Sequence, residues 1–279
     1  MVFDKIPIET EYGEPATLQL YLKERNEENL LDTTFPLILV VPGGGYGFVS
    51  EREAEPVALA FAARGYSTAV LWYNVFPAHY PQQLVELAKS FAFLRRNAER
   101  FCLDPARFAV CGFSAGGHLA ASLGVHWNKP FLQKLAGATA EELRPDRMIL
   151  CYPVVTSKEE FCHGNSFKRL LGENPDPEER KLNCIEEQIT PSFPPTFLWD
   201  TTTDATLTRE NNLALITALF RNAIPCEIHA YGCGPHGLSV ADRTVPAPPP
   251  KPGKPLRNYN IPHVHGWVQL CDEWLNLPL

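Results

Sequence analysis

The amino-acid sequence predicts an α/β protein whose mainly parallel central sheet carries helices on both faces. Runs that are apolar at every residue, such as 37–41 (LILVV), indicate strands buried on both sides, as parallel sheets require. These runs alternate with segments whose apolar residues recur at helical spacing, such as 83–101. Glycine-rich turns follow two of the apolar runs, at 43–45 and 112–117. Alternating strands and helices of this kind are typical of the α/β class.

Each element follows from its local pattern, in chain order. Residues 9–25 alternate apolar and polar side chains, which is typical of one or two strands at the edge of a sheet. Buried strands are expected within residues 35–47, 66–75, 107–114, 147–155, 195–203 and 225–232. Helices are expected within residues 83–101, 116–127, 209–223 and 263–276, and a turn at Asp104-Pro105 separates the first of them from the next strand.

The domain organisation is expected to be simple. A chain of 279 residues, 45% of them hydrophobic, can bury one large core, so we expect a single domain over residues 1–279. Residues 127–192 hold helix-like pieces and loops between strands, which predicts a small cap. Residues 243–262 are proline-rich and cannot form an interior helix or strand, which predicts a surface loop without a catalytic role.

Composition limits the classes of partner. A formal charge of -7 and a pI of about 5.6 argue against nucleic acid or membrane partners and favour neutral substrates such as esters or sugars. The first residues carry no basic region followed by an apolar core, so we expect a cytoplasmic location. No apolar run approaches the length of a membrane span. The eight cysteines are scattered without CxxC pairs, as expected of reduced packing residues.

Ser114 lies in the motif Gly112-Phe113-Ser114-Ala115-Gly116, where a strand-like run meets a helix-like run. This is the GxSxG pattern of a nucleophile elbow. Side chains beside so sharp a turn would collide with it, which explains the two flanking glycines. The serine is thereby lifted above the sheet edge at the start of a helix, and we expect it to be a nucleophile.

A serine hydroxyl needs a base, and the base needs an acid that orients it. After a nucleophile elbow these partners follow in the order acid, then histidine, each in a loop after one of the last strands. His236 lies in the loop after the strand expected within 225–232 and is the expected base. Asp200 ends the strand expected within 195–203, and Asp204 lies in the loop four residues later. Asp204 is favoured because a loop residue beyond the strand end reaches the imidazole better.

Acyl transfer also needs hydrogen-bond donors for the negative oxygen that develops in the reaction. Residues 43–45 are three glycines after an early strand, where backbone N–H groups can approach a substrate closely, and the N–H of Ala115 would be a further donor. The stretch lacks the GxGxxG and GxxxxGK patterns of nucleotide-binding loops. Aromatic residues follow the same strands and would stack on a sugar or bound an acyl pocket: Tyr46, Phe48, Trp72, Tyr73 and Phe76.

With these residues assembled, the chain resembles the α/β-hydrolase fold. More narrowly, it is similar to the bacterial esterase/lipase-like group that includes acetyl esterases of carbohydrates, some of which carry a xylanase label. The resemblance covers nearly the whole chain and rests on residues 40–75, 80–124, 144–157, 194–219 and 234–242. It implies the triad Ser114, Asp204 and His236, with oxyanion donors at Gly44, Gly45 and Ala115. Relatives usually carry histidine where this chain has Asp200, which supports Asp204 as the acid.

The predicted function is therefore a serine carboxylesterase acting on short-chain, acetyl esters, with acetylated carbohydrates as a candidate substrate class and Tyr46, Trp72 and Tyr73 as substrate-binding residues. Two alternatives stay open: an amidase, peptidase or arylformamidase-like enzyme on the same triad, and a non-catalytic binding protein on a hydrolase scaffold. No metal or organic cofactor is expected, and the histidines lack HExxH spacing. The sequence does not predict an oligomeric state.

Overall fold

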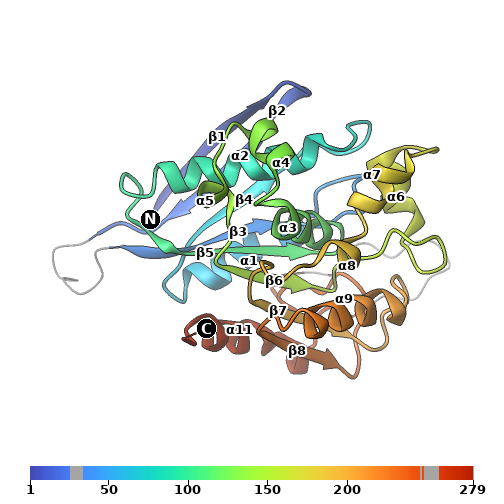
Figure 1. Cartoon of the computed structure of the whole chain (residues 1–279). Coiled ribbons are helices and arrows are strands. Elements are labelled where there is room, and N and C mark those ends of the chain that lie inside the picture. The colour runs from blue at the N-terminus through green and yellow to red at the C-terminus, as the bar shows by residue number, and fades with distance from the viewer. Residues whose placement is uncertain (26–33, 246, 248–257, 279) are drawn as a thin grey trace.

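The computed structural model describes residues 1–25, 34–245, 247 and 258–278, and within them an eight-stranded sheet in the order β1-β2-β4-β3-β5-β6-β7-β8 (Figure 1). The strands are β1 (Val2–Thr10), β2 (Gly13–Leu22), β3 (Phe35–Val41), β4 (Ser67–Trp72), β5 (Leu103–Phe113), β6 (Arg147–Cys151), β7 (Thr196–Thr201) and β8 (Cys226–Tyr231). The β1-β2 and β2-β4 pairs are antiparallel, and every other pair in the sheet is parallel. The predicted fold class is confirmed.

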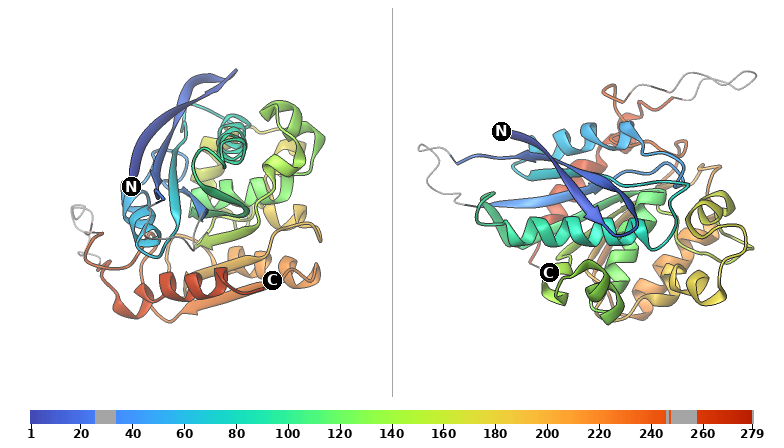
Figure 2. Two further views of the ribbon diagram at one scale, coloured as in Figure 1. Left: turned by 90° about the vertical axis from the view of Figure 1, so that its left-hand side faces the viewer. Right: turned by 90° about the horizontal axis from the view of Figure 1, so that it is seen from above.

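Helices cover both faces of this sheet, as the two views in Figure 2 show. The longer ones are α1 (Glu55–Ala62), α2 (Gln82–Arg96), α3 (Ala115–His126), α6 (Gly164–Leu171), α9 (Arg209–Arg221) and α11 (Trp267–Leu275). The shorter ones are η1 (Glu51–Glu53), α4 (Pro130–Ala136), α5 (Ala140–Leu143), α7 (Pro177–Leu182), α8 (Ile185–Gln188) and α10 (Pro262–His265). Gly266 separates α10 from α11 within the segment predicted as one closing helix.

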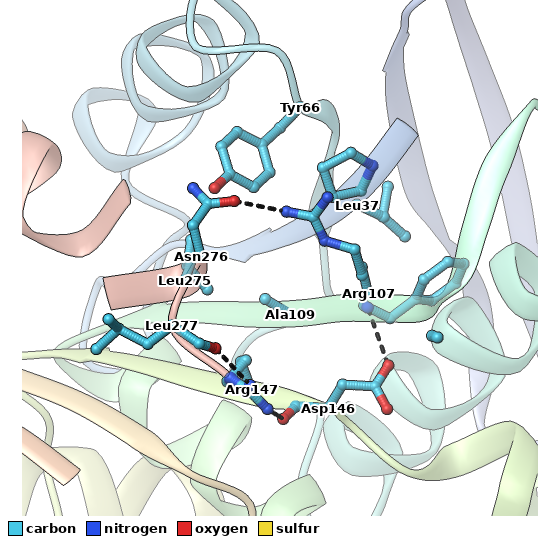
Figure 3. Close-up of a pocket in the computed structure, with 12 residues that line it drawn as sticks. Leu37, Tyr66, Arg107, Ala109, Asp146, Arg147, Leu275, Asn276 and Leu277 are labelled. Carbon is cyan, nitrogen blue, oxygen red and sulfur yellow. Dashed lines mark hydrogen bonds between the residues drawn. The ribbon is translucent and has the colours of Figure 1, made fainter. Parts of the chain in front are cut away.

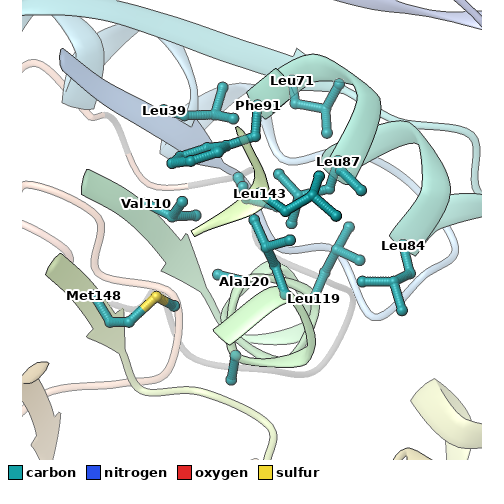
Figure 4. Close-up of a cluster of buried hydrophobic side chains, with 14 of the residues drawn as sticks. Leu39, Leu71, Leu84, Leu87, Phe91, Val110, Leu119, Ala120, Leu143 and Met148 are labelled. Atoms are coloured by element: carbon teal, nitrogen blue, oxygen red, sulfur yellow. The ribbon is translucent and has the colours of Figure 1, made fainter. Parts of the chain in front are cut away.

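Two hydrophobic cores lie on the two faces because successive side chains of a strand point to opposite sides. On one face, Leu39 and Val110 pack against Leu87 and Phe91 of α2 and Leu119 of α3 (Figure 4). On the other face, Val40, Cys111 and Trp199 pack against Phe61 of α1 and Trp267 of α11. The central strands are apolar on both faces because both are covered, as the sequence pattern predicts.

The segment 127–192, predicted to form a cap, is divided by β6. Its first part, α4 and α5, packs beside α2 on one face of the sheet. Its second part, α6 to α8, follows the carboxyl end of β6, which is the end where Ser114 lies. Only this second part is therefore in a position to cover the site.

The proline-rich segment 243–262 lies largely outside the described residues, which omit 246 and 248–257. At its described ends, Val245 and Tyr259 are buried. These two side chains belong to the core on the α1 and α11 face. The ends of the segment are thus held against the domain.

Candidate active site

Ser114 occupies a strained turn between β5 and α3. Its backbone angles are φ 52° and ψ -119°, an unusual conformation for a residue with a side chain. The turn is held by hydrogen bonds to the end of β6: the Ser114 N–H donates to the Cys151 carbonyl at 3.0 Å, and the Val154 N–H donates to the Ser114 carbonyl at 2.9 Å. These two bonds fix the serine above the carboxyl end of the sheet.

The flanking glycines are required by the packing around this turn. A Cβ on Gly116 would lie 2.1 Å from the Val41 carbonyl oxygen, and a Cβ on Gly112 would lie 2.4 Å from the carbonyl oxygen of Gly116. Both contacts are with backbone atoms, which cannot swing aside as a flexible side chain can. The glycines of the sequence motif therefore follow from close approach of backbone segments.

A continuous chain of hydrogen bonds joins Ser114, His236 and Asp204. The Ser114 Oγ lies 2.7 Å from His236 Nε2, and His236 Nδ1 lies 2.6 Å from Asp204 Oδ2. Because a carboxylate accepts from Nδ1–H, Nε2 is left unprotonated and faces the serine hydroxyl. Such an arrangement can remove the serine proton and activate the oxygen as a nucleophile.

The environment of Asp204 keeps its carboxylate ionised. Burial raises the pKa of Asp204, but the hydrogen bond and charge of His236 and the backbone N–H groups of Thr206 and Leu207 outweigh it, so the net pKa is lowered. The two N–H groups donate to Oδ1 at 2.7 and 3.4 Å, which leaves Oδ2 for His236. The carboxylate is thus bound on both oxygens and cannot easily rotate.

Asp200, the other candidate acid, points elsewhere. Its Oδ2 accepts a hydrogen bond from Asn212 Nδ2 of α9 at 2.5 Å. Burial, and to a smaller extent the charge of Asp204, raises the pKa of Asp200, although the Asn212 bond opposes this. Both aspartates line a cavity of about 180 Å³ against α9. The structure therefore joins Asp204, and not Asp200, to the imidazole.

The glycine loop after β3 lies beside Ser114. Gly43 donates its N–H to Glu53 Oε2 at 2.9 Å, so this group is already occupied. The N–H groups of Gly44 and Gly45 have no acceptor among the described residues. Ala115 is the first residue of α3, where N–H groups lack a partner within the helix. The N–H groups of the three predicted oxyanion donors, Gly44, Gly45 and Ala115, are thus not engaged by Glu53, unlike that of Gly43.

The aromatic residues predicted to bind substrate differ in their exposure. Tyr46 and Tyr73 are 1% and 3% exposed, and their hydroxyls bond His118 Nδ1 and the Pro42 carbonyl, each at 2.8 Å. Trp72 is half-buried and donates its indole N–H to Gln19 at 3.1 Å. A substrate-binding role for these three residues stays a prediction, and in this conformation the two tyrosines present no open surface.

Two other aromatic side chains of the same region are open. Phe48 is 61% exposed, and its ring lies beside Gly44. Phe76 is 53% exposed, and its N–H donates to the Tyr46 carbonyl at 2.9 Å. Both rings therefore have surface available to a ligand, and the Phe48 ring lies next to the glycine loop itself.

The sequence did not single out three polar residues in or directly before α6 that lie beside Gly45 of the glycine loop. Arg169 Nη1 donates to the Gly45 carbonyl at 3.1 Å, and Ser166 Oγ lies 2.7 Å from His163 Nδ1. Burial, then the nearby charges of His236 and Arg169, lowers the pKa of His163, although the charge of Asp204 opposes this. No hydrophobic period or motif distinguishes these residues, so only the folded chain shows that they face the site.

A larger cavity, of about 380 Å³, lies near the amino-terminal ends of β5 and β6, away from the carboxyl ends where Ser114 lies (Figure 3). It is lined by Arg107 and Ala109 near the start of β5, Asp146 and Arg147 beside β6, and Asn276 after α11. Because Ser114 follows the other end of β5, roughly 15–20 Å of strand separate the two places. This cavity is not part of the candidate active site.

Among the described residues, no group of three or more His, Cys, Asp or Glu side chains could hold a metal ion. In the same part of the chain, no helix is both long and apolar enough to cross a membrane.

Comparison with known proteins identifies the family. The family model BD-FAE matches residues 18–219. Endo-1,4-beta-xylanase B of Butyrivibrio fibrisolvens is 34% identical over 84% of this chain but 36% of its own length. Acetylxylan esterase of Xylanibacter ruminicola is 25% identical over 72% of this chain and 40% of its own length. The chain thus spans less than half the length of these curated relatives.

A solved structure matches over nearly the full length of both chains. The acetyl ester-xyloside bifunctional hydrolase of Caldicellulosiruptor lactoaceticus is 32% identical, covers 97% of this chain and 94% of its own, and superposes with a TM-score of 0.81. Solved α/β-hydrolases align along almost all of the chain. The protein belongs to the BD-FAE family and has the α/β-hydrolase fold, and the predicted enzyme class, a hydrolase of carboxylic esters, is confirmed at the level of the family.

Proposed function

We propose that this protein is a serine esterase that removes acetyl and other short acyl groups from hydroxylated compounds, with acetylated carbohydrates as its substrate class. The observation that carries the proposal is the unbroken hydrogen-bond chain from Ser114 through His236 to Asp204, at 2.7 and 2.6 Å. It supplies nucleophile, base and orienting acid in the order that acyl transfer requires.

The reaction proceeds in two steps. His236 Nε2 takes the proton of Ser114 as the oxygen attacks the ester carbonyl, and Asp204 stabilises the resulting imidazolium. The carbonyl oxygen, now negative, accepts hydrogen bonds from the N–H groups of the oxyanion site, Gly44, Gly45 and Ala115. His236 returns the proton to the leaving alcohol, and a water molecule then releases the acid from Ser114 by the same route.

The substrate class is supported by two independent points. The relatives are named for acetylxylan and for an acetyl ester-xyloside, so acetyl groups on sugars recur among them. Phe48, 61% exposed, has its ring beside Gly44, and Phe76, 53% exposed, has its backbone bonded to Tyr46 just after the glycine loop. Exposed flat aromatic faces can pack against sugar rings. A sugar bound there would hold its ester carbonyl near Ser114.

Hydrolysis of p-nitrophenyl acetate, butyrate and octanoate tests the reaction. We expect the highest kcat/KM for acetate and a fall with chain length, and a loss of about 1000-fold or more in Ser114→Ala. Turnover of p-nitroacetanilide without turnover of any ester would contradict the proposal and favour the amidase alternative.

Release of acetate from acetylated xylo-oligosaccharides tests the substrate class. We expect Phe48→Ala and Phe76→Ala to raise KM for the oligosaccharides about 5- to 10-fold, as loss of a stacked ring implies, with little change for p-nitrophenyl acetate. Leu213→Ala, at an exposed apolar residue of α9, is the control. Equal effects on both kinds of substrate would contradict a sugar platform at these rings.

A further inference from the structure

Glu53 is a buried carboxylate next to the candidate active site. The residue ends the short helix η1 and is 3% exposed. No cationic group lies within 4.0 Å of it in the described part of the chain. A buried charge of this kind is costly unless hydrogen bonds satisfy it. Two donors do so: the Gly43 N–H reaches Oε2 at 2.9 Å, and the Tyr152 hydroxyl reaches Oε1 at 2.8 Å.

The first donor places Glu53 beneath the glycine loop. A Cβ on Gly43 would lie 2.8 Å from Glu53 Oε2 and 2.9 Å from Ser114 Cβ, so the carboxylate and the serine both approach Gly43 closely, on the side where a side chain would project. The bond fixes the orientation of the peptide group between Pro42 and Gly43, which begins the glycine loop. The direction of the next N–H groups, those of Gly44 and Gly45, depends on that orientation.

The second donor connects Glu53 to His236. The Tyr152 ring packs edge-on against the His236 ring, with centroids 5.0 Å apart. The Tyr152 oxygen also accepts the Ser239 N–H at 2.8 Å, which ties down the loop that carries His236. Burial, then the charge of Glu53, raises the pKa of Tyr152 well above its usual value, so the hydroxyl keeps the proton it donates.

The same loop has a further connection to η1. Arg52 Nη2 donates to the Gly237 carbonyl at 2.9 Å, and Ser239 Oγ donates to the Arg52 carbonyl at 2.5 Å. The segment 50–54 thus contacts the glycine loop on one side and the His236 loop on the other.

We propose that Glu53 is a positioning residue of the esterase reaction: through Gly43 it holds the oxyanion donors, and through Tyr152 it holds the His236 ring. The proposal rests on the proposed function. Nothing in the motif GxSxG or in the order serine, acid, histidine points to this residue.

The experiment compares Glu53→Gln, Tyr152→Phe, the double variant and the control Glu51→Gln, which removes the same charge from an exposed residue of the same short helix. We expect Glu53→Gln to lower kcat on p-nitrophenyl acetate about 10- to 100-fold, the range for one bond to a charged group, with KM within about threefold. We expect Glu51→Gln to keep both kcat and KM within about twofold of the wild type.

Tyr152→Phe keeps the ring against His236 and removes only the hydroxyl link. We expect a smaller loss of kcat, and a double variant that is less impaired than the product of the two single losses, because both remove the same link. Melting temperatures of all variants show whether the loss follows local positioning or global stability. If Glu53→Gln fails to fold, the kcat and the fluorophosphonate labelling rate of Tyr152→Phe test the proposal instead.

Labelling of Ser114 by a fluorophosphonate separates this proposal from the proposed function, because it reports serine reactivity without an ester substrate. Slow labelling of Glu53→Gln beside fast labelling of the wild type supports the positioning role, even if the wild type hydrolyses no ester tried. Equal labelling rates of Glu53→Gln and the wild type, or a kcat of Glu53→Gln within about twofold of the wild type, would overturn it.

Discussion

Replacing Asp204 with asparagine tests the candidate triad most directly. Asp204 Oδ1 accepts two backbone N–H groups, at 2.7 and 3.4 Å, while Oδ2 faces His236 Nδ1 at 2.6 Å. The amide oxygen of an asparagine would keep the Oδ1 position, because only an acceptor fits the two N–H donors. Its NH2 group would then face His236 Nδ1 and donate to it.

This reversal forces the wrong tautomer on the imidazole. With Nδ1 as acceptor, the ring proton moves to Nε2 and points at Ser114 Oγ, where an acceptor is needed. In serine proteases the corresponding substitution lowers kcat about 10,000-fold, or roughly 5.5 kcal/mol of barrier. We expect a loss of about 1000- to 10,000-fold in kcat on p-nitrophenyl acetate, with the fold retained.

Asp200→Asn is the matched control. Asp200 is also partly buried and lies on the same segment, but its carboxylate bonds Asn212 rather than the imidazole. We expect less than a threefold change in kcat, since only a neighbouring charge is removed. The assay is initial rates on p-nitrophenyl acetate between pH 6 and 9, with circular dichroism of each variant. A large loss in Asp200→Asn with more than a tenth of the activity left in Asp204→Asn would refute the reasoning.

Two further predictions concern stability. Gly116→Ala would place a Cβ 2.1 Å from the Val41 carbonyl oxygen, and we expect urea unfolding to show a loss of about 2 kcal/mol or more in the free energy of unfolding. In the control Gly164→Ala no atom lies within 4 Å of the new Cβ, and we expect a change within about 0.5 kcal/mol. Equal losses in the two variants would contradict the steric explanation. Burial lowers the pKa of both His118 and His126 to about 4. Below about pH 6.5 the unfolded chain therefore binds protons that the folded chain does not. We expect the free energy of unfolding to decrease as the pH is lowered, by about 2 kcal/mol per histidine at pH 5. Unfolding free energies at pH 8 and 5 check this, and a dependence that is unchanged in His126→Gln would count against it.

Sequence patterns predicted the central strands because each is buried on both faces. The runs within 35–47, 107–114 and 195–203 are apolar throughout, and β3, β5 and β7 form there. The edge of the sheet was less accessible to prediction. Residues 2–8 of β1 are mostly exposed, so no periodic burial marks them. The helix α1 has no side-chain cap at Ala54, and its start signal, Pro56 in the first turn, was not recognised.

The turn predicted at Asp104-Pro105 shows how pairing overrides a local signal. The structure places both residues inside β5, where the register to β3 shifts between Leu103 and Phe108. The Ala106 N–H still donates to Asp104 Oδ1 at 3.0 Å, as in an Asx turn. The local turn chemistry was recognised correctly, but long-range pairing on either side incorporates it into the strand as an irregularity.

By itself, the sequence predicted the fold class, because apolar periodicity and the glycine motif are local properties of the chain. It also showed the resemblance to a family and supplied the candidate serine, acid and histidine. It left Asp200 and Asp204 as competitors, and it could not show that Tyr46 and Tyr73 are buried while Phe48 and Phe76 are open. Those distinctions, and the contact of Glu53 with Gly43 and Tyr152, depend on distances between segments up to 99 residues apart. No local pattern encodes such distances, since they arise only when the strands pair and the loops at their carboxyl ends meet.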